Sequence, residues 1–333
     1  MSRMLVYSER PGMARELLSF AASTGEPAAI ALLGPGAGDQ DCFAYGAQVA
    51  YTCADPALAE AADETIAMAL GQVVERSGCD IVLIGSTLSG RAVAAHLAQR
   101  LGAGCITDAN GLRCERDAQP GTSGPAGSAS ADHGGRLRLI ATRYALGGNT
   151  LATECILPPH RQVIAVMPQT FEARPRAGQA GGTFEALSLA LPAARARTVE
   201  RQPKQQAGAD VESADVVVCV GRGLGAAADL QMAGALAEAL GGVLACTRPV
   251  SHDRHWLPEK QMVGISGKII SPRLYVGIAL SGQIQHTVGI TGARVTVAIN
   301  SDKGAPIFKM ADYGIVGDAY EVVPRLVEKL GRR

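Results

Sequence analysis

The sequence predicts an α/β protein with two domains, each built on a mainly parallel sheet. Short apolar segments alternate with segments of helical spacing in both halves of the 333-residue chain, a pattern typical of βα repeats. Glycine is abundant, at 40 residues, and aromatic residues make up only 4%, as expected where many tight turns join strands to helices. A stretch rich in Arg, Gln, Pro and Ala divides the chain, so we expect domains at 1–190 and 213–333 and a linker at 191–212.

Strand and helix signals follow one another through the N-terminal half. The apolar runs predict strands at 4–7, 28–33, 80–84, 137–144, 150–156 and 162–167. Helical spacing predicts helices at 10–23 and 57–76, and a third after Gly90 that ends at Leu101. Gly147-Gly-Asn149 predicts the turn of an antiparallel hairpin. Pro, Gly, Ser and Ala dominate 115–135, which therefore predicts an exposed loop.

The C-terminal half repeats the alternation with shorter strands. Strands are expected at 216–220, 243–246, 274–280, 295–300 and 313–316. Helices are expected at 226–240, 281–288, 305–310 and 320–330. Five short strands with intervening helices predict a doubly wound parallel sheet, whose ligand site should lie at the carboxyl ends of the strands.

Composition argues against several classes of partner. The chain is 47% hydrophobic and 19% charged with a formal net charge of zero, so it lacks the basic surface that nucleic acid or anionic lipid requires. We see no transmembrane run and no signal or transit peptide, and expect a cytoplasmic protein. The eight cysteines form no C-x-x-C pair, and His252 and His255 lack an evident third ligand, so no metal site is expected.

Gly221-Arg-Gly-Leu-Gly-Ala226 follows the first strand of the C-terminal half and fits a dinucleotide-binding pattern. A nicotinamide site also needs an acidic residue after the next strand, but that strand ends in Cys246-Thr247-Arg248. A nicotinamide dehydrogenase is therefore disfavoured, although Arg248 could read a 2′-phosphate. A tight turn with close strand–helix packing remains an alternative explanation of the glycines.

A second glycine turn, Ser281-Gly-Gln-Ile-Gln-His286, follows the apolar run 274–280. We expect Ser281 to begin a helix there, leaving backbone N–H groups free to bind phosphate. His286 would then lie about one turn inside the same site. This combination predicts a nucleotide cofactor with a chemically active ring.

A larger block of motifs surrounds this turn. It comprises Gly264-Ile-Ser-Gly-Lys268, Pro272-Arg-Leu-Tyr-Val276, Ser281–His286, Val297-Ala-Ile-Asn-Ser-Asp302, Ala305-Pro-Ile-Phe308 and Ala311-Asp-Tyr-Gly-Ile-Val-Gly-Asp318. The block closely resembles the alpha subunit of electron transfer flavoprotein (the ETF alpha/FixB family). The resemblance covers nearly the whole chain and is most specific between Leu274 and Asp318.

The resemblance implies an N-terminal domain of the adenine-nucleotide alpha-hydrolase type of α/β fold and a C-terminal domain that binds FAD. It also implies a heterodimer with an ETF beta subunit that carries AMP or a second FAD. Such a protein shuttles electrons through a flavin semiquinone, from a flavin-dependent dehydrogenase to a quinone reductase or another acceptor. A non-redox nucleotide-binding or regulatory module on the same folds is the alternative.

The resemblance also implies the site residues. Arg248, Ser266 and His286 correspond to residues beside the flavin ring, where a cation and hydrogen-bond donors suit a ring that gains negative charge on reduction. The implied cofactor contacts are Arg222, Thr247, Arg248, Val263, Gly264, Ile265, Ser266, Ser281, Gly282, Gln283, Ile284, Gln285, His286, Asn300, Asp318 and Ala319.

Two departures from the family pattern concern the flavin surroundings. Ile265 stands where many members have Gln, and Pro249-Val-Ser-His-Asp253 stands where an Asp commonly follows sooner. Both predict altered tuning of the flavin potential and leave the expectation of FAD binding intact.

Overall fold

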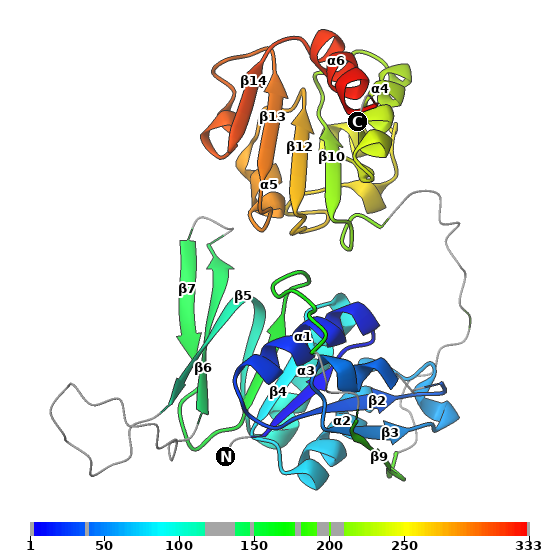
Figure 1. Cartoon of the computed structure of the whole chain (residues 1–333), viewed down its shortest axis with the longest axis vertical. Coiled ribbons are helices and arrows are strands. Elements are labelled where there is room, and N and C mark those ends of the chain that lie inside the picture. The colour runs from blue at the N-terminus through cyan, green and yellow to red at the C-terminus, as the bar shows by residue number, and fades with distance from the viewer. Residues whose placement is uncertain are drawn as a thin grey trace, which may run out of the picture. The chain divides into compact units, whose positions relative to one another are not determined.

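The computed structural model describes residues 3–36, 40–116, 137–146, 150–176, 181–191, 200 and 210–331 (Figure 1). The chain forms two compact units, one from Met1 to Arg201 apart from residues 146–150, and one that contains Gln202–Arg333. The expected linker at 191–212 lies mostly outside the described residues, so the domain bounds 1–190 and 213–333 stay predictions. Residues 117–135 of the expected loop and the turn Gly147–Asn149 also lie outside them.

The N-terminal unit is built on a nine-stranded sheet in the order β7-β6-β5-β8-β4-β1-β2-β3-β9. From β5 through β8, β4, β1, β2 and β3 to β9 the strands are parallel, and β6 pairs with β5 in antiparallel fashion. The strands are β1 Met4–Tyr7, β2 Ala28–Leu33, β3 Val49–Cys53, β4 Ile81–Gly85, β5 Gly104–Arg116, β6 Leu137–Ala145, β7 Thr150–Cys155, β8 Gln162–Val166 and β9 Thr183–Ala186. This sheet confirms the mainly parallel α/β prediction.

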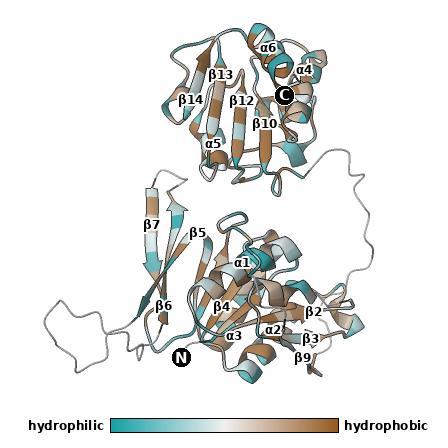
Figure 2. Ribbon diagram, viewed as in Figure 1, coloured by the Kyte–Doolittle hydropathy of each residue, from teal (hydrophilic) through white to brown (hydrophobic). Residues whose placement is uncertain are grey.

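Helices cover both faces of this sheet. One face carries α1 (Pro11–Ser23), whose Leu17 and Leu18 join the first hydrophobic cluster. The other carries α2 (Asp63–Ser77) and α3 (Leu88–Leu101), which contribute Leu70 and Leu97 to the second. The central strands are the most hydrophobic part of the unit (Figure 2), because burial on both faces selects apolar residues at nearly every position.

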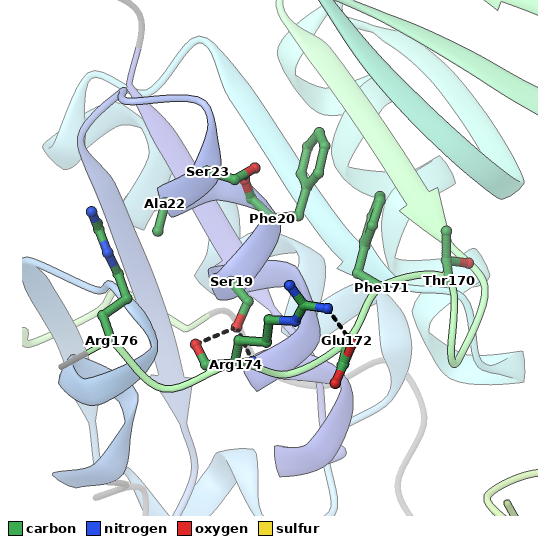
Figure 3. Close-up of a pocket in the computed structure, with 9 residues that line it drawn as sticks. All are labelled: Ser19, Phe20, Ala22, Ser23, Thr170, Phe171, Glu172, Arg174 and Arg176. Atoms are coloured by element: carbon green, nitrogen blue, oxygen red, sulfur yellow. Dashed lines mark hydrogen bonds and ion pairs between the residues drawn. The ribbon is translucent and has the colours of Figure 1, made fainter. Parts of the chain in front are cut away.

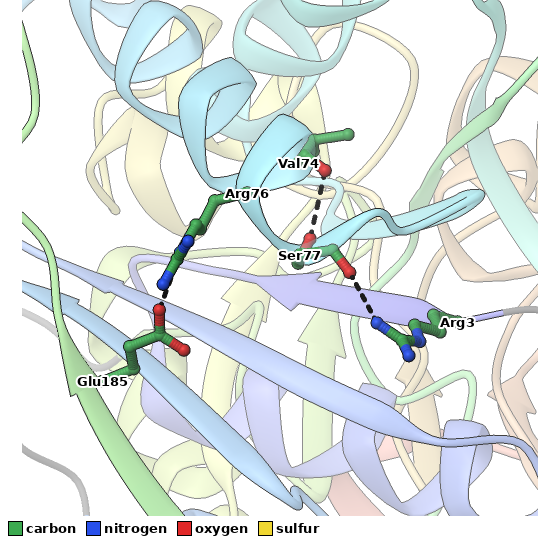
Figure 4. A network of polar contacts seen from close by, with 5 residues as sticks. All are labelled: Arg3, Val74, Arg76, Ser77 and Glu185. Atoms are coloured by element: carbon green, nitrogen blue, oxygen red, sulfur yellow. Dashed lines mark hydrogen bonds and ion pairs between the residues drawn. The ribbon is translucent and has the colours of Figure 1, made fainter.

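Polar contacts fix the end of α2 against the sheet (Figure 4). Arg3, just before β1, donates to the carbonyl of Ser77 at 3.2 Å, and the Ser77 hydroxyl donates to the carbonyl of Val74. Arg76 pairs with Glu185 of β9 at 2.8 Å. The bond from Arg3 satisfies a carbonyl group that a helix end leaves without a partner, and the ion pair ties the last turn of α2 to β9.

The C-terminal unit contains a five-stranded sheet of order β11-β10-β12-β13-β14, and all four pairings are parallel. Its strands are β10 Val216–Val220, β11 Val243–Cys246, β12 Leu274–Ile278, β13 Thr296–Asn300 and β14 Tyr313–Val316. Helices α4 (Leu230–Ala239) and α6 (Ala319–Gly331) pack together on one face. The order reverses between β10 and β12, so the sheet is doubly wound as predicted and has its switch point there.

The structure corrects several expected element bounds. The helix expected at 57–76 begins at Asp63, and Pro56–Leu58 forms a separate short 3-10 turn capped by Asp55. The helix expected at 281–288 is a single turn, α5 (Ile284–Thr287), followed by a 3-10 turn. Strands β3, β5 and β9 were not predicted. Among the described residues, no helix is both long and apolar enough to cross a membrane.

Candidate cofactor-binding site

The strand ends of the C-terminal sheet bring most of the predicted site residues to one edge. Because the five strands are parallel, their carboxyl ends meet there. The residues that follow or end the strands are Arg222 after β10, Thr247 and Arg248 after β11, Ser281–Gln285 after β12, Asn300 at the end of β13, and Asp318 and Ala319 after β14. The sequence-based placement of a ligand site at this edge therefore has a consistent geometry.

The turn Gly221–Ala226 uses its own amides to hold the fold together. Four backbone N–H groups donate within the unit: Gly221 to Ile278 O at 2.9 Å, Gly223 to Ala279 O at 3.0 Å, Gly225 to the Tyr320 hydroxyl at 2.8 Å and Ala226 to Asp229 Oδ2 at 2.7 Å. A Cβ on Gly221 would lie 2.4 Å from Ala279 O. The close-packing explanation of these glycines therefore fits, and these four amides are engaged by protein acceptors.

In the turn after β12, by contrast, the backbone amides are not engaged by protein acceptors among the described residues. Within the described part of the chain, the backbone N–H groups of Ser281, Gly282 and Gln283 have no acceptor. Gly282 has φ +78°, and a Cβ there would lie 2.4 Å from the nitrogen of Ile307, which itself donates to Ser281 O at 3.0 Å. Only glycine fits this position. Free amides beside exposed side chains form a surface suited to an anionic group such as phosphate.

The expectation that Ser281 begins a helix is wrong. Gln283 occupies the N-cap of α5, and the helix has four residues from Ile284 to Thr287. A single turn carries little dipole, so any attraction for phosphate at Ser281–Gln283 comes from the loop amides themselves.

A second loop brings the predicted ring contacts close to this turn. Residues Gly264–Gly267 form a tight turn, closed by the Gly267 N–H donating to Gly264 O at 2.9 Å. Ile265 N–H donates to Gln285 O at 2.8 Å, which joins the turn to α5. A Cβ on Gly264, whose φ is +138°, would lie 2.5 Å from that same carbonyl oxygen. Ile265 and Ser266 are left exposed at the tip.

Arg248 and Thr247 complete this group from the end of β11. Arg248 is exposed, and its Nη1 donates to Ser266 Oγ at 3.4 Å. Thr247 is only 8% exposed, and its Oγ1 has no hydrogen-bond partner among the described residues. A buried hydroxyl without a partner is costly, so a polar atom of a bound cofactor would satisfy it. The residues present thus fit a nucleotide cofactor that has a polar ring.

Two more buried atoms without a hydrogen-bond partner among the described residues lie just after Arg248 in the chain. The sequence did not identify their residues as cofactor contacts. Ser251 Oγ and His252 Nδ1 are buried without a partner in the described structure. No local sequence signal distinguishes them, because their burial depends on how the turn Pro249–Asp253 packs in the folded unit.

His286 differs most from its expected role. Its ring is buried, with Nε2 at 2.7 Å from the Tyr275 hydroxyl and Nδ1 at 3.0 Å from Val263 O. Burial lowers the pKa of His286 to about 4, so the ring is neutral at pH 7. Tyr275 is the second residue of β12, so His286 packs against the sheet and both ring nitrogens are engaged by protein groups.

The remaining predicted contacts lie around the proposed site, at the carboxyl ends of the strands. Asn300 Nδ2 donates to Leu280 O at 2.7 Å and its Oδ1 accepts from Asp302 N–H, so it fixes the approach to the Ser281 turn. Asp318 accepts the Tyr320 N–H at 2.9 Å at the start of α6. Arg222 is exposed, and Ala319 is buried.

The N-terminal unit contains a separate pocket of about 550 Å³ between α1 and the segment after β8 (Figure 3). Phe20 and Phe171 stack at 4.4 Å in its wall, and Arg174 pairs with Glu172 at 2.7 Å. None of the predicted cofactor contacts lines this pocket.

The N-terminal sheet has its own switch point, between β1 and β4, where the order β3-β2-β1-β4-β8 reverses. Three hydroxyl groups at the start of α3 meet carboxylates there: Thr87 donates to Glu9, Ser89 to Asp63, and Ser86 to Asp108 at 2.6 Å. Arg91 also pairs with Asp108 at 3.0 Å. Three carboxylates at this position oppose the binding of a phosphate group.

Comparison with known proteins identifies the family of both parts of the chain. Residues 210–291 match the model of the electron transfer flavoprotein FAD-binding domain, and residues 12–192 match the model of the electron transfer flavoprotein domain. Protein FixB of Salmonella typhimurium is 32% identical over 331 residues, which is 99% of each chain. Protein FixB of Escherichia coli O7:K1 is 35% identical over 271 residues, which is 81% of this chain and 80% of the relative. The C-terminal unit is therefore an FAD-binding domain, and the chain belongs to the electron transfer flavoprotein alpha subunit (FixB) family.

Proposed function

We propose that this chain is the FAD-binding alpha subunit of a heterodimeric electron transfer flavoprotein. In this proposal it accepts electrons from a flavin-dependent dehydrogenase and passes them to a quinone reductase or another acceptor. The ETF beta subunit, carrying AMP or a second FAD, is its partner. Family membership supports the class of function, and the donor, the acceptor and the direction of flow are our proposal.

The observation that carries the proposal is the contrast between the two glycine turns. In the Gly221–Ala226 turn the amides of all three glycines and of Ala226 are engaged, whereas the amides of Ser281, Gly282 and Gln283 are free within the described residues. A nicotinamide enzyme binds its pyrophosphate at the first kind of turn. We therefore infer that the pyrophosphate of FAD lies at the Ser281 turn.

The other residues would hold and tune the cofactor. FAD supplies the redox chemistry when bound, through its isoalloxazine ring. Arg248 supplies the positive charge, Ser266 and Thr247 supply hydroxyl groups, and Asn300 fixes the loop that leads to Ser281. With His286 neutral, Arg248 is the predicted ring contact that provides a cation.

The test is the cofactor content of the chain co-expressed with its beta subunit. We expect a yellow heterodimer that releases FAD on denaturation and is bleached by dithionite. Release of FMN, or no flavin after reconstitution with FAD, would contradict the proposal. A complex that binds only colourless nucleotides would favour the regulatory alternative.

The direction of electron flow needs a separate assay. Candidate dehydrogenases with their substrates should reduce the bound flavin, and a quinone reductase should reoxidise it. Flavin that no dehydrogenase reduces, while dithionite does, would contradict the proposed donor class and leave the cofactor assignment in place.

A further inference from the structure

A set of buried polar groups lies in the C-terminal unit, next to the turn that carries Ile265 and Ser266. Cys219 of β10 packs in the same buried cluster as Tyr275 of β12. The Tyr275 hydroxyl lies 2.7 Å from His286 Nε2, and His286 Nδ1 lies 3.0 Å from Val263 O. Cys219 and Tyr275 are fully buried and His286 is 7% exposed. We call these four groups the Tyr275 network.

Elementary hydrogen bonding fixes the protons of this network. The carbonyl of Val263 can only accept, so His286 Nδ1 must carry the proton that it donates. In a neutral ring Nε2 then accepts, and the Tyr275 hydroxyl is its donor. The protons therefore point in one order, from Tyr275 through His286 to Val263.

Burial keeps this order stable near neutral pH. It lowers the pKa of His286 to about 4 and raises the pKa of Tyr275 well above its usual value. The pKa of the Cys219 thiol is raised by the same cause. These are the titratable groups that the network contains, and each is neutral at pH 7.

The network ends at the turn that carries the exposed Ile265 and Ser266. Val263 directly precedes Gly264, and its N–H donates to Cys246 O at 2.9 Å. On the other side of the turn, Ile265 N–H donates to Gln285 O, next to His286. His286 thus holds the turn through Val263, while its neighbour Gln285 holds it through Ile265.

We propose that Tyr275 is a positioning residue, which holds the His286 ring in place by donating to its Nε2 and, through that ring, fixes the turn that presents Ile265 and Ser266 to the flavin. This inference rests on the proposed function, because it takes that turn as a wall of the flavin site. In this arrangement His286 contributes to the flavin potential through the turn it positions, with both ring nitrogens engaged by Tyr275 and Val263.

The first experiment needs no flavin. Long-range ¹H–¹⁵N NMR spectra of the FAD-free full-length chain, labelled at its histidines, report which ring nitrogen carries a proton. The His286→Gln variant assigns the signal among the six histidines. We expect a neutral Nδ1–H ring from pH 5 to pH 8, and a shift of the Nε2 resonance toward that of an unbonded nitrogen in Tyr275→Phe. An Nε2–H or doubly protonated ring at pH 7 would overturn the inference.

The second experiment uses the FAD-containing heterodimer and a double-mutant cycle on the flavin reduction potential. Tyr275→Phe and His286→Gln should each shift the potential, and the double variant should match His286→Gln, because Tyr275 acts through His286. Tyr313→Phe removes a hydroxyl from an exposed position on β14 and should leave the potential unchanged. Additive shifts, or no shift in Tyr275→Phe, would overturn this inference. A complex that binds no FAD would instead overturn the proposed function.

Discussion

At the scale of single residues, Arg248 and Ser266 form a side-chain contact between the end of β11 and the Gly264–Gly267 turn of the proposed flavin site. The 3.4 Å separation leaves the serine hydroxyl weakly held and able to reach a ligand. We expect Ser266→Ala to bind FAD normally but to shift its potential, since a hydrogen bond of about 1 kcal/mol corresponds to ~40 mV for a one-electron couple. Ser266→Thr, which keeps the hydroxyl, should stay close to wild type. A potentiometric titration of Ser266→Ala that overlays wild type would contradict the contact.

His286 makes a second residue-scale prediction, on stability. Its folded pKa of about 4 lies below the unfolded value of 6.5, so the unfolded chain binds the proton more tightly. The stabilisation is fully present above pH 6.5 and is lost as the pH falls toward 4, by about 3 kcal/mol in all. Between pH 7 and pH 5, urea unfolding should show about 2 kcal/mol of this loss in wild type and in the control His96→Gln, at an exposed helix position. An equal loss in His286→Gln would exclude His286 as its origin.

The position of the proposed site residues at strand ends could be predicted from the sequence, but the contacts of their side chains could not. Ser281, Gly282 and Arg248 follow strand ends, and the strand ends were visible as apolar runs. The orientation of His286 was not visible, because it depends on a tyrosine eleven positions earlier and on the carbonyl of Val263. The unsatisfied Thr247 hydroxyl likewise emerges only from packing.

At the scale of elements, the turn after β12 is held by backbone conformation. We expect Gly282→Ala to lower FAD affinity at least about 10-fold, because the left-handed conformation costs an alanine about 1–2 kcal/mol and its Cβ would collide with the backbone of Ile307. Gly234→Ala is the matched control, since a Cβ there meets nothing within 4 Å inside α4. Flavin content measured after gel filtration separates the two. Full FAD content in Gly282→Ala would show that the turn tolerates another geometry.

The elements that the sequence failed to predict share a physical cause. Strand β5 contains Asp108, Asn110 and Gly111 and is largely exposed or half-buried, so it lacks the apolar run that identifies buried strands. It is a strand because β8 and β6 pair with it on either side. The start of α2 was misplaced because alanines continue the helical spacing back toward Pro56, whereas the chain turns before Asp63.

At the scale of the whole molecule, the two units have separate hydrophobic clusters, and the single tryptophan, Trp256, belongs to the C-terminal one. Its fluorescence therefore reports on the proposed flavin-binding unit. We expect FAD at 100 times its Kd to stabilise the Trp256 transition by about 2.7 kcal/mol. Hydrogen exchange in β4, at the centre of the N-terminal sheet, should not change. Equal protection of β4 by FAD would indicate that the units unfold together.

The three carboxylates at the switch point of the N-terminal sheet have a consequence for stoichiometry. Both sheets reverse their strand order, and the switch point of each sheet is a position where a nucleotide could bind. Glu9, Asp63 and Asp108 occupy the first such place and accept bonds from the hydroxyl groups that begin α3. These carboxylates would oppose a phosphate group there, whereas the free amides of the Ser281 turn would attract one. We therefore expect the chain to hold one equivalent of flavin, measured as FAD released per chain.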